Sequence, residues 1–279
     1  MLEKFLEVIE NYDAKNTRLF FITREVKPNI PKRAKVMDKF KFNTYAVNSD
    51  KEVKEHLHLV LKKQIDKLIK KKYTLVDFDV ISDDTTKIFS YDIKNKKMSF
   101  NSVMNNDFQS KLDIPNFEGT EALTKNETLW AYCIGVFDEK NNWYYSFKKI
   151  LSSKVAVDSL KNPESSKLVK AFRTKYNDSS RTLEVLHGET INLDSYIDCL
   201  FFNDIFYVVH KSNFEKIINL EAEYKETAID MVNEMKKSKK ILGADILLDI
   251  LEHNPKYHKK IVKIKQLGVY EKLDNPEIF

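Results

Sequence analysis

The sequence is poor in the residues that cross-link or break a chain. Its 279 residues include only 2 cysteines, 5 glycines and 6 prolines, which excludes a disulfide scaffold and a chain dominated by glycine-rich loops. No run approaches the ~20 consecutive apolar residues that a helix needs to span a bilayer. The 47 basic and 42 acidic residues leave a net charge of +5, which is only a weak preference for polyanions. With 42% hydrophobic residues, we expect one large or two modest domains with regular elements.

Motifs for nucleotide, hydrolase and zinc chemistry are also missing. No Gly-x-Ser-x-Gly, Gly-x-x-x-x-Gly-Lys or Gly-x-Gly-x-x-Gly occurs in the chain. His56 and His58 are two residues apart and His253 and His258 are five apart, whereas two zinc ligands on one helical face are four apart. We therefore expect no cofactor and no zinc site.

The two cysteines and the start of the chain favour a cytoplasmic protein. Both cysteines lie in apolar, strand-like runs at residues 130–137 and 197–202, where a thiol behaves as a small buried hydrophobe. The first four residues, Met-Leu-Glu-Lys, begin an amphipathic segment and not a basic-then-apolar leader. We expect no direct membrane insertion, so that any position at the inner face of a membrane would come through a partner.

The hydrophobic pattern predicts an α+β fold of antiparallel hairpins, with one long helix in the N-terminal half and a helical C-terminal tail. Asp50 should start the long helix, which continues to about Lys72. Residues 94–120 are polar, and we expect them to be irregular, so we place a boundary there, between an N-terminal α+β region (1–120) and a C-terminal α+β region (121–279). The remaining predicted strands are 18–26, 73–81, 87–93, 129–138, 143–150, 168–176 and 181–187, and the tail helices are 215–237, 245–252 and 255–266.

Residues 193–211 form the strongest local pattern in the chain. Two strands rich in β-branched and aromatic residues meet at Asn203-Asp204, a dipeptide typical of a two-residue hairpin turn. Ser212 or Asn213 then supplies a helix start. The sequence therefore predicts a hairpin with a helix behind it.

Three short motifs in this hairpin and helix resemble those of a known family. They are Ile197-Asp198, Phe206-Tyr207-Val208-Val209 and Asn213-Phe214-Glu215. In this order they are similar to the B component, KwaB, of the Kiwa anti-phage defence system, with the best match over residues 165–240. The resemblance implies a soluble effector that binds DNA beside a membrane-embedded partner, and it assigns no catalytic residues. The sequence leaves open whether the chain also forms a homo-oligomer.

Two lysine clusters have the spacing of a helix face. Lysines three or four residues apart lie on one side of a helix, where they could follow a phosphate backbone. The structural explanation of these clusters is a solvent-exposed helix face without a binding role, since the helix dipole also favours lysine near a helix C-terminus. The candidate nucleic-acid-binding residues are Lys63, Lys67, Lys70, Lys71, Lys256, Lys259, Lys260 and Lys263.

A first alternative is a metal-dependent nuclease. Asp77 and Asp79 alternate along a predicted strand and should project from one side of it, where two carboxylates could hold a divalent cation. Asp83, Asp84 and Lys87 follow closely and could complete such a site. Acidic residues are also common on the solvated face of an amphipathic strand, which is the structural explanation of the pair.

The hairpin itself carries an incomplete version of a nuclease motif. Asp198 could be the first acid of the restriction-endonuclease arrangement, but Val209 stands two residues before Lys211, where a metal-binding carboxylate is needed. We therefore expect a scaffold hairpin or a degenerate site, with Asp198 capping or pairing locally.

A second alternative is a protein-interaction module without nucleic-acid affinity. It would present aromatic strands such as Trp143-Tyr144-Tyr145 as an exposed patch to another subunit. The preferred hypothesis remains an anti-phage effector that binds DNA non-specifically through basic helix faces, and enzymatic activity is not predicted.

Overall fold

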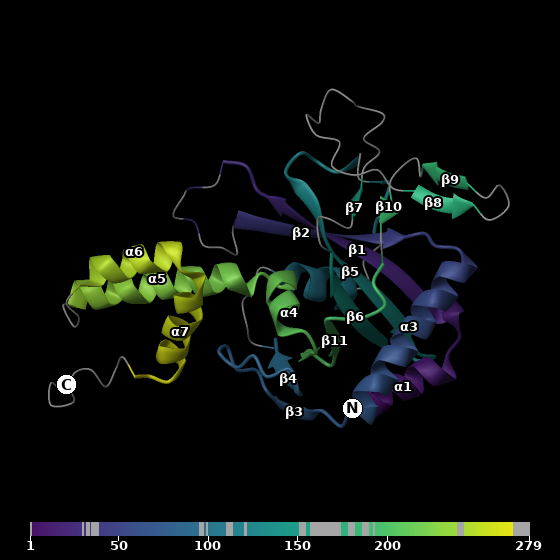
Figure 1. The fold of residues 1–279 in the computed structure, drawn as a ribbon, viewed down its shortest axis with the longest axis horizontal. Coiled ribbons are helices and arrows are strands. Elements are labelled where there is room, and N and C mark those ends of the chain that lie inside the picture. The colour runs from purple at the N-terminus through teal and green to yellow at the C-terminus, as the bar shows by residue number, and fades with distance from the viewer. Residues whose placement is uncertain are drawn as a thin grey trace.

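A single mixed sheet forms the centre of the protein (Figure 1). The computed structural model describes residues 2–29, 31, 34, 39–94, 98, 100–109, 114–119, 122–150, 155–156, 174–177, 182–185, 190–191, 193–238 and 243–269. The sheet strands, in spatial order, are β2 (Phe40–Val47), β1 (Thr17–Val26), β5 (Glu127–Phe137), β6 (Trp143–Lys149), β11 (Cys199–Phe202), β12 (Ile205–Val208), β4 (Lys87–Asp92) and β3 (Thr74–Asp77). All neighbours are antiparallel except β3 and β4, which are parallel. The α+β prediction is confirmed.

Strands from the two halves of the sequence share this sheet. The four strands β5, β6, β11 and β12 come from the C-terminal half and lie between β1 and β4 of the N-terminal half. The boundary predicted within residues 94–120 therefore falls between strands of one sheet. Two short pairs lie outside it: β7 (Val155–Ala156) with β10 (Thr190–Ile191), and β8 (Thr174–Asn177) with β9 (Thr182–Val185). Residues 168–173 of a predicted strand lie outside the described part of the chain.

The hairpin of β11 and β12 matches its prediction. Asn203 and Asp204 have φ angles of 51° and 60°, the left-handed conformation that a tight two-residue turn requires. The helix behind it, α4 (Lys211–Ile217), starts slightly earlier than predicted and has no side-chain cap. Ser212 and Asn213 both lie inside this helix, so the prediction that one of them starts it is wrong.

Two N-terminal helices cover one face of the sheet. α1 (Leu2–Asn11) and α3 (Lys51–Lys70) pack side by side on it, and a short 3-10 turn, η1 (Ala14–Asn16), follows α1 (Figure 1). The carboxylate of Asp50 accepts a 2.8 Å hydrogen bond from the backbone N of Val53, which is how an N-cap aspartate satisfies a free N–H group. The helix predicted from Asp50 is confirmed.

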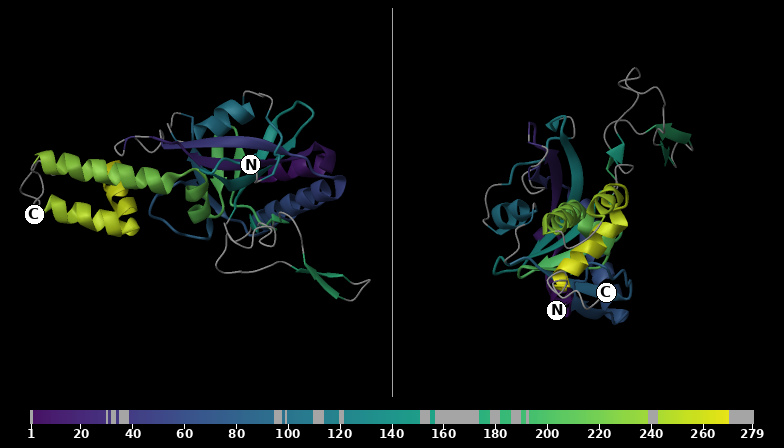
Figure 2. Two further views of the ribbon diagram at one scale, coloured as in Figure 1. Left: turned by 90° about the horizontal axis from the view of Figure 1, so that it is seen from above. Right: turned by 90° about the vertical axis from the view of Figure 1, so that its left-hand side faces the viewer.

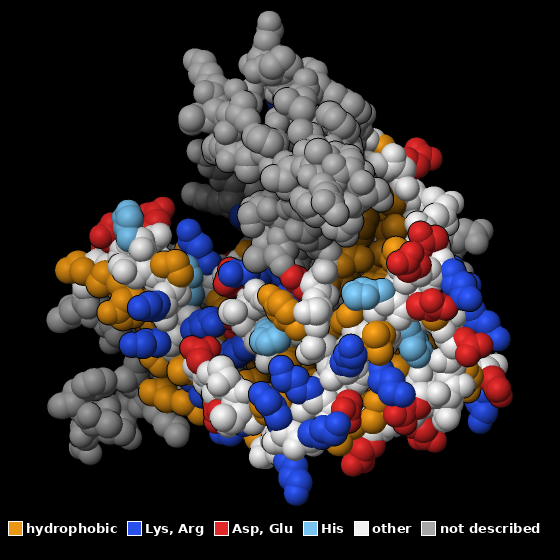
Figure 3. Space-filling model, turned by 45° about the vertical axis from the view of Figure 1, so that its right-hand side comes forward, with side chains coloured by type: hydrophobic (Ala, Val, Ile, Leu, Met, Phe, Trp, Pro, Cys, Tyr) orange, Lys and Arg blue, Asp and Glu red, His pale blue; other side chains and the backbone are white. Residues whose placement is uncertain are grey.

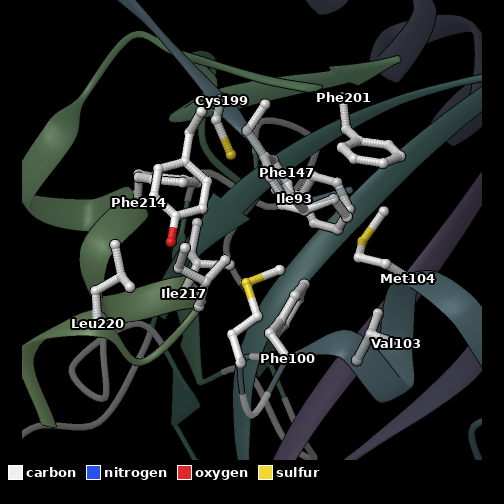
Figure 4. Close-up of a cluster of buried hydrophobic side chains, with 14 of the residues drawn as sticks. Ile93, Phe100, Val103, Met104, Phe147, Cys199, Phe201, Phe214, Ile217 and Leu220 are labelled. Atoms are coloured by element: carbon white, nitrogen blue, oxygen red, sulfur yellow. The ribbon is translucent and has the colours of Figure 1, made fainter. Parts of the chain in front are cut away.

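The opposite face is covered by a segment that was expected to be irregular. Residues Ser102–Gln109 form the helical turn η2, and Phe100, Val103 and Met104 are fully buried against the sheet (Figure 4). The prediction that this segment is irregular is wrong at residues 102–109. A few apolar side chains are enough to hold a helical turn against the sheet, because the sheet supplies most of the core into which they pack. Cys199 lies in the same cluster; both cysteines are buried and free, as predicted, and burial raises the pKa of each thiol.

The C-terminal helices extend away from the sheet at the end of the molecule opposite α3 (Figures 1 and 2). They are α5 (Leu220–Ser238), α6 (Ala244–His253) and α7 (Pro255–Gln266), and they share a small hydrophobic core. The single helix predicted for 215–237 is wrong, because Asn219 has a φ of 66° and separates α4 from α5. None of the described helices is long and apolar enough to cross a membrane.

Close packing at Gly135 of β5 leads to the first testable prediction. A Cβ atom at this position would lie 2.9 Å from two ring carbons of Trp143 and 3.2 Å from a ring carbon of Phe20. We expect Gly135→Ala to lower the free energy of unfolding by about 1–3 kcal/mol through overpacking, measured by urea denaturation. Thr128→Ala, at an exposed position of the same strand, is the control and should have little effect. An unchanged midpoint for Gly135→Ala would show that the Trp143 ring shifts freely.

Candidate nucleic-acid interface

The lysines of α3 lie on an exposed helix face with mixed charges. Lys63 and Lys67 are exposed and form no ion pair with the described residues. Lys70 donates a 2.6 Å hydrogen bond to Asp66, which neutralises it locally, and Lys71 follows the last residue of the helix. On the side of the molecule that Figure 3 shows, basic side chains are interspersed with acidic ones. Three of the four candidate lysines at α3, namely Lys63, Lys67 and Lys71, therefore have no acidic partner among the described residues.

The lysines of α7 are divided between solvent and the core. Lys256 and Lys260 are exposed, and neither forms an ion pair with a described residue. Lys259 donates a 2.6 Å hydrogen bond to Glu215, whose side chain is 1% exposed. Burial raises the pKa of Glu215, and the contact with Lys259 opposes that rise. Lys259 thus holds α7 against α4.

The four candidate lysines of α7, which we call the α7 ridge, end at Lys263, and Lys263 contacts the candidate metal ligand Asp79. Lys263 donates a 3.1 Å hydrogen bond to Asp79, which lies beyond the end of β3, and not within the strand as predicted. The other carboxylate oxygen of Asp79 accepts from the backbone N of Ile81 at 2.9 Å, and this bond helps to lower the pKa of Asp79. Asp77 accepts from the hydroxyl of Ser90. In the described part of the chain, no group of three or more His, Cys, Asp or Glu could hold a metal ion.

Asp198 lies in a buried polar cluster and not at an open site. Its carboxylate accepts from the Nζ of Lys148 at 3.0 and 3.1 Å, the backbone N of Lys149 at 2.8 Å and the side chain of Asn213 at 2.9 Å. Burial alone would raise the pKa of Asp198, but hydrogen bonds from His210 and these neighbours hold it below its ordinary value. The local pairing expected for Asp198 is confirmed, and it ties the hairpin to β6.

The aromatic strand proposed as an exposed patch is buried. Tyr144 and Tyr145 are 2% and 6% exposed, and Trp143 stacks on Tyr145 with ring centroids 5.6 Å apart. The exposed-patch prediction is wrong because both faces of the sheet are covered, so side chains on either side of β6 pack into a core.

A basic pocket that sequence reasoning missed lies next to α7. We call it the α5 pocket; its volume is about 610 Å³, and it is located where the start of α5 meets α7 and the sheet. It is lined by Arg24, Phe40, Trp130, Lys216, Asn219, Glu221, Ala222, Tyr224, Lys225, Pro255, His258 and Lys259. The pocket is therefore continuous with the α7 ridge through Lys259.

A β-bulge directs the indole of Trp130 into this region. The register between β1 and β5 shifts at Ile22 and Thr23, which leaves Trp130 as the extra residue beside Ala131. The guanidinium of Arg24 lies 3.4 Å from the centroid of the Trp130 ring and 4.8 Å from that of Phe40. Burial lowers the pKa of Arg24 to about 10, so it remains charged at neutral pH. Two aromatic rings thus hold a cation at the pocket.

Asn219 completes the wall of the α5 pocket. It is 5% exposed, and its left-handed backbone is a conformation that asparagine adopts more readily than most residues. Its side-chain oxygen accepts a 3.3 Å hydrogen bond from Nη1 of Arg24. The Nδ2 of Asn219 and the Nε of Arg24 are buried, and neither has a hydrogen-bond partner in the part of the chain that the structure describes. No sequence signal links these residues, because 195 positions separate them and only the fold brings them together.

Comparison with known proteins assigns the chain to a family. A family model described as Kiwa protein KwaB-like matches residues 125–279. The match includes β5, β6, the β11–β12 hairpin and all helices from α4 to α7, and thus extends beyond the 165–240 segment that carries the resemblance. No curated protein and no solved structure matches the chain. Since more than half of its residues are matched, the chain belongs to the Kiwa KwaB-like family.

Proposed function

We propose that this member of the Kiwa anti-phage defence system binds DNA non-specifically, through lysine side chains that contact phosphates. Membership of the KwaB-like family supports the defence role. The observation that carries the DNA-binding proposal is the exposure of Lys256 and Lys260 on α7, both without acidic partners among the described residues. They are one helical turn apart, so both can face the same backbone.

The cations near α7 extend the proposed interface. Lys216 and Lys225 line the adjacent α5 pocket, and Lys225 is exposed. α3, which carries Lys63 and Lys67, lies apart from α7 in Figure 1, so its lysines would form a separate contact. Two separate basic helices suit a polyanion that is long compared with the protein. We propose α7 as the main contact because its lysines adjoin further cations.

Charge reversal on α7 tests the proposal. Lys256→Glu combined with Lys260→Glu should weaken binding to a random-sequence duplex by about tenfold or more, because two phosphate contacts are replaced by repulsion. The slope of log K against log salt should become shallower by about 2. Fluorescence anisotropy over a salt series measures both. Lys259 and Lys263 are left intact because reversing them would break the contacts with Glu215 and Asp79.

A matched control separates local contact from net charge. Lys125→Glu combined with Lys140→Glu makes the same charge change at exposed positions outside α3 and α7. This control should bind almost as well as the wild type at moderate salt, where the Debye length is about 10 Å. Equal loss in both double variants, or no loss in either, would refute α7 as the contact. Lys63→Glu combined with Lys67→Glu measures how much α3 contributes to the affinity for DNA.

A membrane-embedded partner is the second part of the proposed function, and it follows from the family resemblance. Cell fractionation with and without the Kiwa membrane component tests it. The chain should move from the supernatant to the membrane pellet only when that component is present. Sedimentation that does not depend on the component would contradict this part of the proposal and leave the DNA-binding part untouched.

A further inference from the structure

We propose that the α5 pocket binds the phosphate monoester of a nucleotide. This site is distinct from the phosphodiester contacts on α7 and does not require that DNA binds there. The ligand chemistry follows from the donors, charges and dimensions of the pocket.

The unpaired polar atoms of the pocket call for an acceptor. The Nε of Arg24 and the Nδ2 of Asn219 are both hydrogen-bond donors, and both are buried without a partner among the described residues. Buried donors without partners are uncommon and costly, so two in one pocket indicate a ligand rich in acceptor oxygens. A phosphate monoester presents three such oxygens and a charge close to −2 at neutral pH.

The electrostatics of the pocket favour an anion. Arg24, Lys216, Lys225 and Lys259 line it, against a single lining acid, the exposed Glu221. Lys259 is paired with a buried glutamate, which leaves three cations for a ligand. The start of α5 contributes as well, because the first N–H groups of a helix have no partner within the helix and carry a partial positive charge.

The guanidinium of Arg24 is fixed in an orientation that suits hydrogen bonding to an oxyanion. Phe40 and Trp130 lie at 4.8 and 3.4 Å from its guanidinium, and Asn219 accepts from its Nη1. The indole nitrogen of Trp130 donates to the backbone oxygens of Ile217 at 2.9 Å and Lys216 at 3.1 Å, so the end of α4 is attached to the same ring. A guanidinium fixed in this way loses little side-chain entropy when it binds a phosphate.

The shape of the pocket distinguishes a monoester from a diester. Asn219 is 5% exposed, so its donor lies below the surface, which favours a phosphate that arrives end-on over a phosphate with chain on both sides. The volume of about 610 Å³ is larger than a phosphate requires and is within the range of small-ligand sites. The pocket is thus sized for a mononucleotide or for the 5′-terminal nucleotide of a strand.

Binding of adenosine 5′-monophosphate, with adenosine as the comparison, tests this assignment by isothermal titration calorimetry. The monophosphate should bind, and adenosine should bind at least about tenfold more weakly, since it lacks the charge-assisted bonds. Asn219→Gly retains the left-handed backbone and removes the donor, so it should weaken monophosphate binding by about tenfold. Asn219→Asp is nearly isosteric and places a carboxylate against the phosphate, so it should abolish binding even if the glycine variant folds poorly.

Oligonucleotides identify the source of the phosphate and separate this site from the α7 ridge. If the ligand is a DNA end, a 5′-phosphorylated strand should bind more tightly than its 5′-hydroxyl counterpart, and Asn219→Asp should remove that difference. If the ligand is a free nucleotide, the two strands should bind alike while the monophosphate still binds. Lys256→Glu with Lys260→Glu should weaken monophosphate binding much less than Asn219→Asp does. The inference is overturned if neither the monophosphate nor the 5′-phosphate shows an effect that depends on Asn219.

Discussion

Asp198→Ala is expected to lower the free energy of unfolding by about 3–5 kcal/mol, the cost of leaving one charge of a buried ion pair without its partner. The side chain of Lys148 is 2% exposed and lies 3.0 Å from this carboxylate. The substitution also removes the acceptor for Asn213 and for the backbone N of Lys149. Urea denaturation followed by circular dichroism measures the loss.

A paired substitution shows whether the charge left behind causes this loss. Asp198→Leu combined with Lys148→Met replaces both ions with apolar side chains of similar size, and such replacements are often close to neutral. The double variant should therefore be more stable than Asp198→Ala. If the free energy of unfolding of Asp198→Ala lies within about 1 kcal/mol of the wild-type value, Lys148 must find another acceptor. Asp194, whose carboxylate lies 3.9 Å from the Nζ of Lys148, is a candidate.

Stability should rise with pH because of Lys149. Burial, followed by the charges of Arg24 and Lys216, lowers the pKa of Lys149 from 10.5 to about 7. Because the pKa of Lys149 is lower in the folded protein, the folded protein binds fewer protons than the unfolded chain between about pH 7 and pH 10. The contribution of Lys149 to the free energy of unfolding is therefore lowest below about pH 7. Stability is then gained as pH increases from about 7 to about 10. The full gain is on the order of 4 kcal/mol.

The slope of stability against pH is the measurement that checks this. Urea denaturation between pH 6.5 and 9.5 should show rising stability for the wild type and a flatter profile for Lys149→Met. The slope is more informative than the absolute value, since Lys149 also donates to the backbone oxygens of Trp130 and Ile150, and methionine cannot. Parallel profiles for the two proteins would show that Lys149 remains protonated in the folded state throughout this range.

Local signals in the sequence predicted much of the scaffold. The hairpin turn at Asn203-Asp204, the helix that begins after Asp50 and the burial of both cysteines are each determined by residues within one or two turns of chain. The long-range pairing of the strands carries no such signal. The parallel pairing of β3 with β4 and the insertion of four C-terminal strands between N-terminal ones were therefore not predicted.

Lysine spacing predicted which residues share a helix face but not which of them remain free. Helical periodicity places Lys256, Lys259, Lys260 and Lys263 close together on α7, whereas the docking of α7 decides that Lys259 meets Glu215 and Lys263 meets Asp79. Both acids are distant in sequence, so no local pattern could reveal these contacts. The same docking closes one side of the α5 pocket.

The sequence by itself determined the α+β class, the amphipathic α3, the β11–β12 hairpin and the resemblance on which the family assignment was first based. Each depends on short-range periodicity or on turn conformations that a few residues specify. Tertiary structure alone decided that Arg24, Trp130 and Asn219 meet in one pocket and that Asp198 is enclosed with Lys148. Strand register, one bulge and a helix break at Asn219 produce these sites, because burial and charge pairing depend on what the fold places opposite each side chain.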